Sequence, residues 1–433
     1  MNANAYRAFT AWRRGLDAYA YLLRPRVMDP NTAHIGDFDY LFDPAKVEVI
    51  YRKALDAASE CGSGVSLDQA APHKRVINFG YPDSYRIKCE LWPWAEMSGP
   101  GSQRFILGWA DLEQVRGSSE TFKATLALIY LTHLHHKSKS LDADEVQWRL
   151  QQFLSELSGS GCTETQRAHR TFRDLIEGSI CTATANRIAL QELRNLGLRP
   201  RKYKLPSRLA RRALTMGKQR SLARTRVVSV VGPDGVGKTS VIGAYTSGNH
   251  RPEATSLRYK TLFRKFGGFR AIYLANQKLA DRGVDTFGTT QSNLIDERIS
   301  PLVVLSALPA YYLLTLWVTI VRLLRKDHIV LMDRYFWDYL ILPRSSTGQL
   351  ARIRSARALL QATPRASLAV VLVAPPKSIR SRKEELDEPT IGSIYDHYLY
   401  CFARGRAIRL AIVPTTGTVE DAARGLQSFL SEE

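Results

Sequence analysis

Cysteine is scarce in this chain, which has five cysteines in 433 residues and no C-x-x-C pair. Disulfide-stapled domains and structural zinc sites both need closely spaced cysteines, so neither class is expected here. The N-terminal segment also lacks an apolar run of signal-peptide length. Together these absences predict a reduced, cytoplasmic protein.

Acidic residues are also few: 41 Asp and Glu stand against 61 Lys and Arg, for a net charge of +20. The imbalance is concentrated in residues 198–226, which contain eleven basic residues and no acidic one. We interpret this segment as a solvated linker, with peripheral contact to an anionic membrane as the alternative. Nucleic acid is not expected as a partner. On either interpretation, residues 201–225 separate two domains.

A glycine-rich stretch, GPDGVGKTS, lies just past the middle of the chain. Its pattern, G-x-x-x-x-G-K-T, is typical of a phosphate-binding loop, whose glycines let backbone N–H groups surround phosphate oxygens. Lys238 would neutralise the β- and γ-phosphates, and the Thr239 hydroxyl would bind magnesium. The flanking residues predict a strand before the loop and a helix after it. The sequence therefore predicts an ATP and Mg²⁺ site formed by Gly232, Pro233, Asp234, Gly235, Val236, Gly237, Lys238, Thr239 and Ser240.

Strand and helix patterns alternate over residues 226–433, which predicts a parallel sheet with helices. Ligands of such sheets bind at the C-terminal ends of the strands. The glycine-rich loop falls at one such end, and Asp333, which closes the β-branched run IVLMD, falls at another. We therefore predict an α/β nucleotide-binding domain over this half of the chain.

The motifs GPDGVGKTS, DRYFWDYL and APPKSIRSRK, in this order, resemble the thymidylate-kinase-like branch of P-loop nucleoside monophosphate kinases. The resemblance implies that Asp333 places magnesium or the acceptor and that Arg334 grips the acceptor phosphate. It also implies a lid that carries Arg382 over the transferring group. Lys238, Arg334 and Arg382 could together supply the positive charge that phosphoryl transfer needs. Arg258 is the candidate acceptor contact.

The first half contains a second set of carboxylates. Asp37 and Asp39 stand two apart on a predicted strand, so both would point to one face, and Glu90 lies on a later strand. Paired carboxylates at this spacing can hold a divalent cation. The arrangement resembles a nucleotidyltransferase fold, whose degenerate form precedes a thymidylate-kinase-like domain in some bacterial proteins. The domain could be catalytic or a binding-only remnant, or the acids could lie on the surface of an unrelated fold.

Residues 299–321 are free of charge over more than the roughly 18 residues of a transmembrane candidate. A single crossing there would put Lys238 and Asp333 on opposite sides of the bilayer, and Pro301 and Pro309 interrupt the run. We predict a buried helix, with insertion into one leaflet as the alternative.

Four regions follow from these patterns. They are an α+β nucleotidyltransferase-like domain (1–117), a helical region (118–200), a basic linker (201–225) and a P-loop kinase domain with a parallel sheet (226–433). The leading function is an ATP-dependent phosphotransferase acting on a nucleoside monophosphate or related small acceptor. The alternatives are a nucleotidyltransferase with a regulatory P-loop half, a kinase of a saccharide or lipid-linked intermediate, and a non-catalytic ATP-binding module. The acceptor and the oligomeric state, a homodimer included, stay open.

Overall fold

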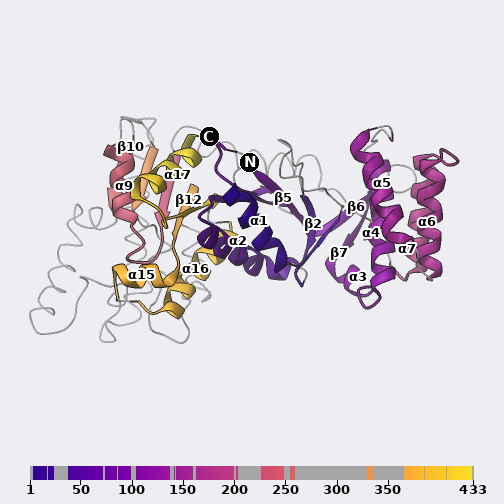
Figure 1. Cartoon of the computed structure of the whole chain (residues 1–433), viewed down its shortest axis with the longest axis horizontal. Coiled ribbons are helices and arrows are strands. Elements are labelled where there is room, and N and C mark those ends of the chain that lie inside the picture. Colours follow the sequence, from indigo (N-terminus) through magenta and orange to yellow (C-terminus); the bar gives the residue numbers. More distant parts are fainter. Residues whose placement is uncertain are drawn as a thin grey trace, which may run out of the picture.

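A computed structural model gives the fold of the chain (Figure 1). It describes residues 3–16, 18–23, 38–71, 74–84, 86–98, 104–136, 141, 143–158, 162–198, 201–202, 226–247, 254–258, 329–333, 335, 365–384, 386–405 and 407–431. The charge-free run 299–321 and most of the predicted basic linker lie outside these ranges. Among the helices within them, none combines the length and apolarity that a membrane crossing requires.

The protein is a mixed α/β structure around one sheet of ten strands, ordered β1-β2-β5-β4-β3-β13-β12-β9-β11-β10. The first half supplies β1 Ala20–Leu22, β2 Phe38–Phe42, β3 Val65–Ala71, β4 Lys74–Phe79 and β5 Ile87–Trp92. The second half supplies β9 Arg226–Val231, β10 Ala254–Arg258, β11 Ile329–Asp333, β12 Ala366–Val373 and β13 Ala407–Pro414. The five later strands pair in parallel, as their sequence predicts.

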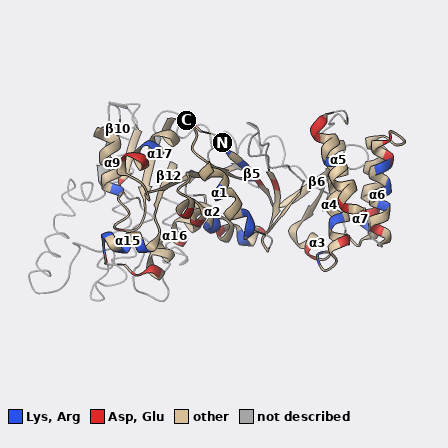
Figure 2. Ribbon diagram, viewed as in Figure 1, with Lys and Arg blue, Asp and Glu red and all other residues tan. Residues whose placement is uncertain are grey.

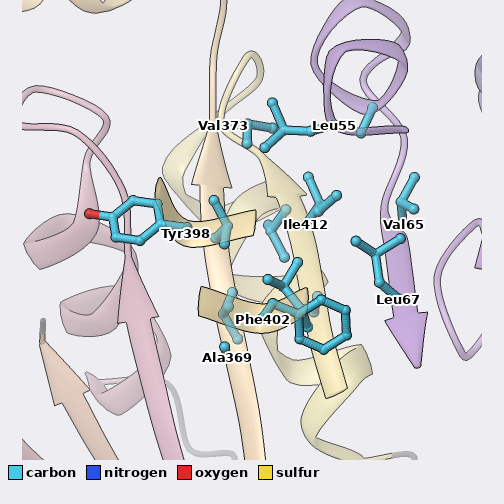
Figure 3. Close-up of a cluster of buried hydrophobic side chains, with 14 of the residues drawn as sticks. Leu55, Val65, Leu67, Ala369, Val373, Tyr398, Phe402 and Ile412 are labelled. Carbon is cyan, nitrogen blue, oxygen red and sulfur yellow. The ribbon is translucent and has the colours of Figure 1, made fainter. Parts of the chain in front are cut away.

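The two halves meet where β13 pairs with β3 in antiparallel register. Val65 lies opposite Ile412, and Leu67 lies opposite Leu410. One hydrophobic core extends across this junction and contains buried side chains from both halves (Figure 3). The predicted regions 1–117 and 226–433 therefore share a sheet and a core, which the sequence did not indicate.

Helices cover the sheet on both faces (Figure 1). Helices α2 and α16 pack together over the β3–β13 junction, while α9 and α17 pack together on the opposite face. Their bounds, with those of the neighbouring helices, are α1 Ala3–Arg14, a 3-10 turn Pro44–Lys46, α2 Val47–Cys61, α9 Lys238–Ser247, α15 Pro376–Arg382, α16 Glu388–Ala403 and α17 Val419–Ser431.

Local sequence explains several of these elements. Strand β12 is buried along nearly its whole length, and its continuous run of Val, Leu and Ala suits a parallel strand covered on both faces. Helix α17 begins with a capping box formed by Thr418 and Asp421. Asp421 N donates to Thr418 Oγ1 at 3.1 Å, and Thr418 N donates to Asp421 Oδ2 at 3.1 Å.

The helical region predicted at 118–200 forms a bundle with its own core. It consists of α4 Ser119–His136, α5 Asp144–Leu157, α6 Thr163–Ile176 and α7 Thr182–Asn195. A short helix and a small antiparallel sheet lie beside it, namely α3 Trp109–Glu113, β6 Trp94–Ser98, β7 Arg104–Gly108 and β8 Arg201–Lys202. The five cysteines, all within the described ranges, form no disulfide with one another.

Candidate functional site

The glycine-rich loop joins the central strand β9 to helix α9, which is the strand–loop–helix context that the sequence predicts. Gly235 and Gly237 have φ values of 87° and 98°, in the left-handed region where side chains are strained. The loop therefore turns tightly, with Val236 N donating to Pro233 O at 3.3 Å. It brings together all nine residues predicted to bind nucleotide, from Gly232 to Ser240.

Lys238 is the first residue of α9, and its side chain lies almost entirely within the loop, 7% exposed. Its Nζ donates to Gly232 O at 2.6 Å and to Pro233 O at 2.9 Å. Asp234 Oδ1 lies 3.4 Å from the same nitrogen. The ammonium is thus held at the centre of the loop, where it can interact with a phosphate oxygen.

Asp333 ends β11 next to this loop. The Thr239 hydroxyl donates to Asp333 Oδ2 at 3.3 Å, although 94 residues separate the two. A hydroxyl and one carboxylate are the small protein ligand set that Mg²⁺ takes when phosphates and water complete its octahedron. These two residues therefore fit a magnesium ion bound together with nucleotide.

The residue after Asp333, Arg334, lies outside the part of the chain that the structure describes. Tyr335 follows it and is fully buried, and burial raises the pKa of its phenol. Arg258, the candidate acceptor contact, ends β10 at the register position opposite Asp333. The backbone therefore brings this arginine to the same edge of the sheet as the loop.

Helix α15 carries basic residues along its short length (Figure 2) and lies against the loop. A Cβ added at Gly235 would come within 3.1 Å of Lys383 Cβ and 3.3 Å of Ile379 O. Arg382 Nη2 donates to Thr415 O at 3.1 Å, at the end of β13. The predicted lid arginine thus stands at the edge of the sheet where β9, β11, β12 and β13 all end.

Alanine at Gly235 is expected to lower both stability and nucleotide affinity. Positive φ costs a non-glycine residue roughly 1–3 kcal/mol, and the added methyl would push α15 away from the loop. Gly243, inside α9, is the matched control, because a Cβ there meets nothing within 4 Å. Alanine in a helix interior should stabilise the fold by about 0.5–1 kcal/mol. Urea denaturation and calorimetric ATP titration of both variants check this; a Gly235→Ala protein that matches wild type would contradict it.

Of the first-half carboxylates, the structure describes Asp39 and Glu90. Asp37 lies outside the described ranges, while Asp39 on β2 is buried and lies opposite Glu90 on β5. Glu90 Oε1 contacts Lys74 Nζ at 2.6 Å and Lys88 Nζ at 2.7 Å. Burial alone would raise the pKa of Glu90, but the hydrogen bonds and charges of the two lysines outweigh it and lower that pKa.

Two lysines therefore already neutralise the carboxylate that would complete a cation site in the first half. No group of three or more His, Cys, Asp or Glu side chains suited to a metal occurs within the described ranges. The metal role of Asp37 and Asp39 stays a prediction. Period-two alternation along β5 places Lys88 and Glu90 on one face, but nothing in the sequence indicates that Lys74, on β4, reaches the same carboxylate.

No protein-family model matches the chain, and a search of curated proteins finds no match either. The contacts described above are therefore the basis for assigning a role to the candidate site.

Proposed function

We propose that the chain is an ATP-dependent phosphotransferase of the thymidylate-kinase-like type. ATP and Mg²⁺ bind at the glycine-rich loop, and the γ-phosphate passes to a nucleoside monophosphate or a related small acceptor. The observation that carries the proposal is the contact of Thr239 with Asp333 beside a lysine held inside the loop. Lys238 and Thr239 open the helix that follows β9, and Asp333 ends the neighbouring parallel strand β11. The three groups therefore meet at the edge where such sheets bind ligands.

Phosphoryl transfer depends mostly on positioning and charge neutralisation, and different residues of the site would supply each. Backbone N–H groups of the loop and the positive end of α9 bind the phosphates. Thr239 and Asp333 would hold Mg²⁺, which would supply positive charge against the phosphates. Lys238 and Arg382 add positive charge around the transferring group, and Arg334 would do so on the acceptor side.

Product analysis tests this proposal. The full chain is incubated with γ-labelled ATP, Mg²⁺ and a panel of nucleoside monophosphates, sugars and lipid-linked saccharides. ADP together with a labelled acceptor supports the proposal and names the acceptor class. AMP and pyrophosphate would instead support nucleotidyl transfer, and ATP binding with no product would support a binding module.

Changing the first-half aspartates should leave ADP formation nearly intact. Because Glu90 is neutralised by Lys74 and Lys88, we expect the double variant Asp37→Asn/Asp39→Asn to keep kinase turnover within about threefold of wild type. The same samples should release no pyrophosphate from any NTP with Mg²⁺ or Mn²⁺. Pyrophosphate release by wild type that disappears in the double variant would make the first half a second active site.

A further inference from the structure

Helix α2, in the first half of the chain, is bonded to helix α16, which follows α15 and its basic residues. Arg52 on α2 donates from Nη1 to Gly392 O and to Asp396 Oδ1, both at 2.9 Å. Its Nε donates to Asp56 Oδ1 at 2.9 Å, one turn along its own helix. One guanidinium thus holds the first turns of α16 from a helix that lies about 340 residues earlier in the chain.

The hydrogen bond from Arg52 to the Gly392 carbonyl fixes the position of α16 more strongly than the ion pairs of Arg52 with Asp56 and Asp396 do. The Asp56 and Asp396 side chains are about half exposed, at 46% and 52%, and exposed ion pairs contribute little to stability. Burial of Arg52 opposes its charge, but the two carboxylates outweigh burial and raise its pKa. The guanidinium therefore stays charged, and its planar fork fixes the direction of α16 relative to α2.

Helix α16 also contacts the end of β12, the strand that leads into α15. Tyr395, next to Asp396, is buried, and its hydroxyl donates to Leu372 O at 3.4 Å and accepts from Ala374 N at 3.3 Å. Both partners lie at the end of β12, immediately before α15. Helix α16 thus fixes the point from which α15 starts.

We propose that Arg52 is a positioning residue for the active site. It fixes α16 and, through the Tyr395 hydroxyl, the start of α15, so that Lys383 stays beside the glycine-rich loop and Arg382 stays at the end of β13. Its catalytic consequence rests on the proposed function, whereas its effect on α15 does not. The first half of the chain then positions α15 at the nucleotide site without contacting the nucleotide.

The experiment compares Arg52→Ala with Arg404→Ala in the full chain. Arg404 Nη1 contacts Glu48 Oε1 at 3.7 Å, which joins the same two regions at the far end of α16. Hydrogen exchange is followed for the amides of residues 377–383, and kcat and KM for ATP are measured in parallel.

We expect exchange in α15 to rise about tenfold in Arg52→Ala and to stay at the wild-type rate in Arg404→Ala. The Arg52→Ala kcat should fall about tenfold, with KM for ATP within about twofold, because the loop that binds ATP is unchanged. Arg52→Lys keeps the charge but not the fork, so it should recover part of kcat. If Arg52→Ala fails to fold, Tyr395→Phe removes only the hydroxyl and should raise α15 exchange in the same way.

The outcomes separate the two proposals. If α15 exchange is unchanged in Arg52→Ala and in Tyr395→Phe, positioning by Arg52 is wrong whatever the turnover. If Arg52→Ala and Arg404→Ala behave alike, Arg52 contributes only to general docking, and the proposal is overturned. If wild type makes no ADP but α15 exchange responds to Arg52→Ala, the kinase proposal fails and the positioning role stands.

Discussion

Lys238→Ala should reduce ATP turnover by at least about 100-fold in kcat. The side chain lies within the loop, where its ammonium can neutralise charge that develops on the transferring phosphoryl group. Alanine keeps the helix start but leaves the carbonyls of Gly232 and Pro233 without this donor, which costs roughly 1–3 kcal/mol. We therefore expect a folded protein with a slightly lower Tm and almost no ADP formation.

Steady-state ADP production, calorimetric ATP binding and thermal unfolding check this result. Lys123→Ala is the matched control, because it removes an exposed lysine from helix α4 of the separate helical bundle. That variant should keep wild-type turnover and Tm. Wild-type turnover in Lys238→Ala would show that the glycine-rich loop is not the site of ATP chemistry.

Residues 226–433 produced alone should fail to form a stable fold. Without the first half, β13 becomes a bare sheet edge, and Phe402, Leu410 and Ile412 lose the first-half side chains that cover them (Figure 3). Burying three such side chains is worth about 5–9 kcal/mol at 1.5–3 kcal/mol each. This is of the same order as the net stability of a typical domain, about 5–15 kcal/mol.

The fragment would also lose the polar contacts that join it to the first half. Arg409 Nε donates to Asp68 Oδ1 at 2.7 Å, and Ser428 Oγ on α17 donates to Asp83 Oδ1 at 2.8 Å. We expect aggregation or an uncooperative thermal transition for the fragment. As a control, the full chain with a protease site inserted at residues 203–225 should, after cleavage, still elute as one complex from a sizing column. A monomeric fragment with a cooperative transition close to that of the full chain would contradict the prediction.

Elements with a local signal were predictable from the sequence. The strands that became β9, β11 and β12 are short apolar runs bounded by polar residues, and such runs suit strands buried on both faces. The capping box at Thr418 and Asp421 needs only four consecutive residues. Asp333 could be placed at a strand end by the same reasoning, because parallel strands end at a common edge. The contact of Lys74 with Glu90 carried no such signal, and Arg334 stays a prediction because it lies outside the described residues.

What the sequence by itself determined is therefore the glycine-rich loop with its flanking elements, the parallel strands of the second half and the helical bundle. Only the tertiary structure decided that β3 pairs with β13, that Arg52 reaches Gly392 and that Tyr395 holds the end of β12. The physical reason is that these long-range contacts are made largely by backbone groups. Nearly every residue carries a backbone N–H and a carbonyl oxygen, so no side-chain pattern indicates which of these groups will pair. Which of them pair across more than 300 residues is settled by how the two halves bury a common core.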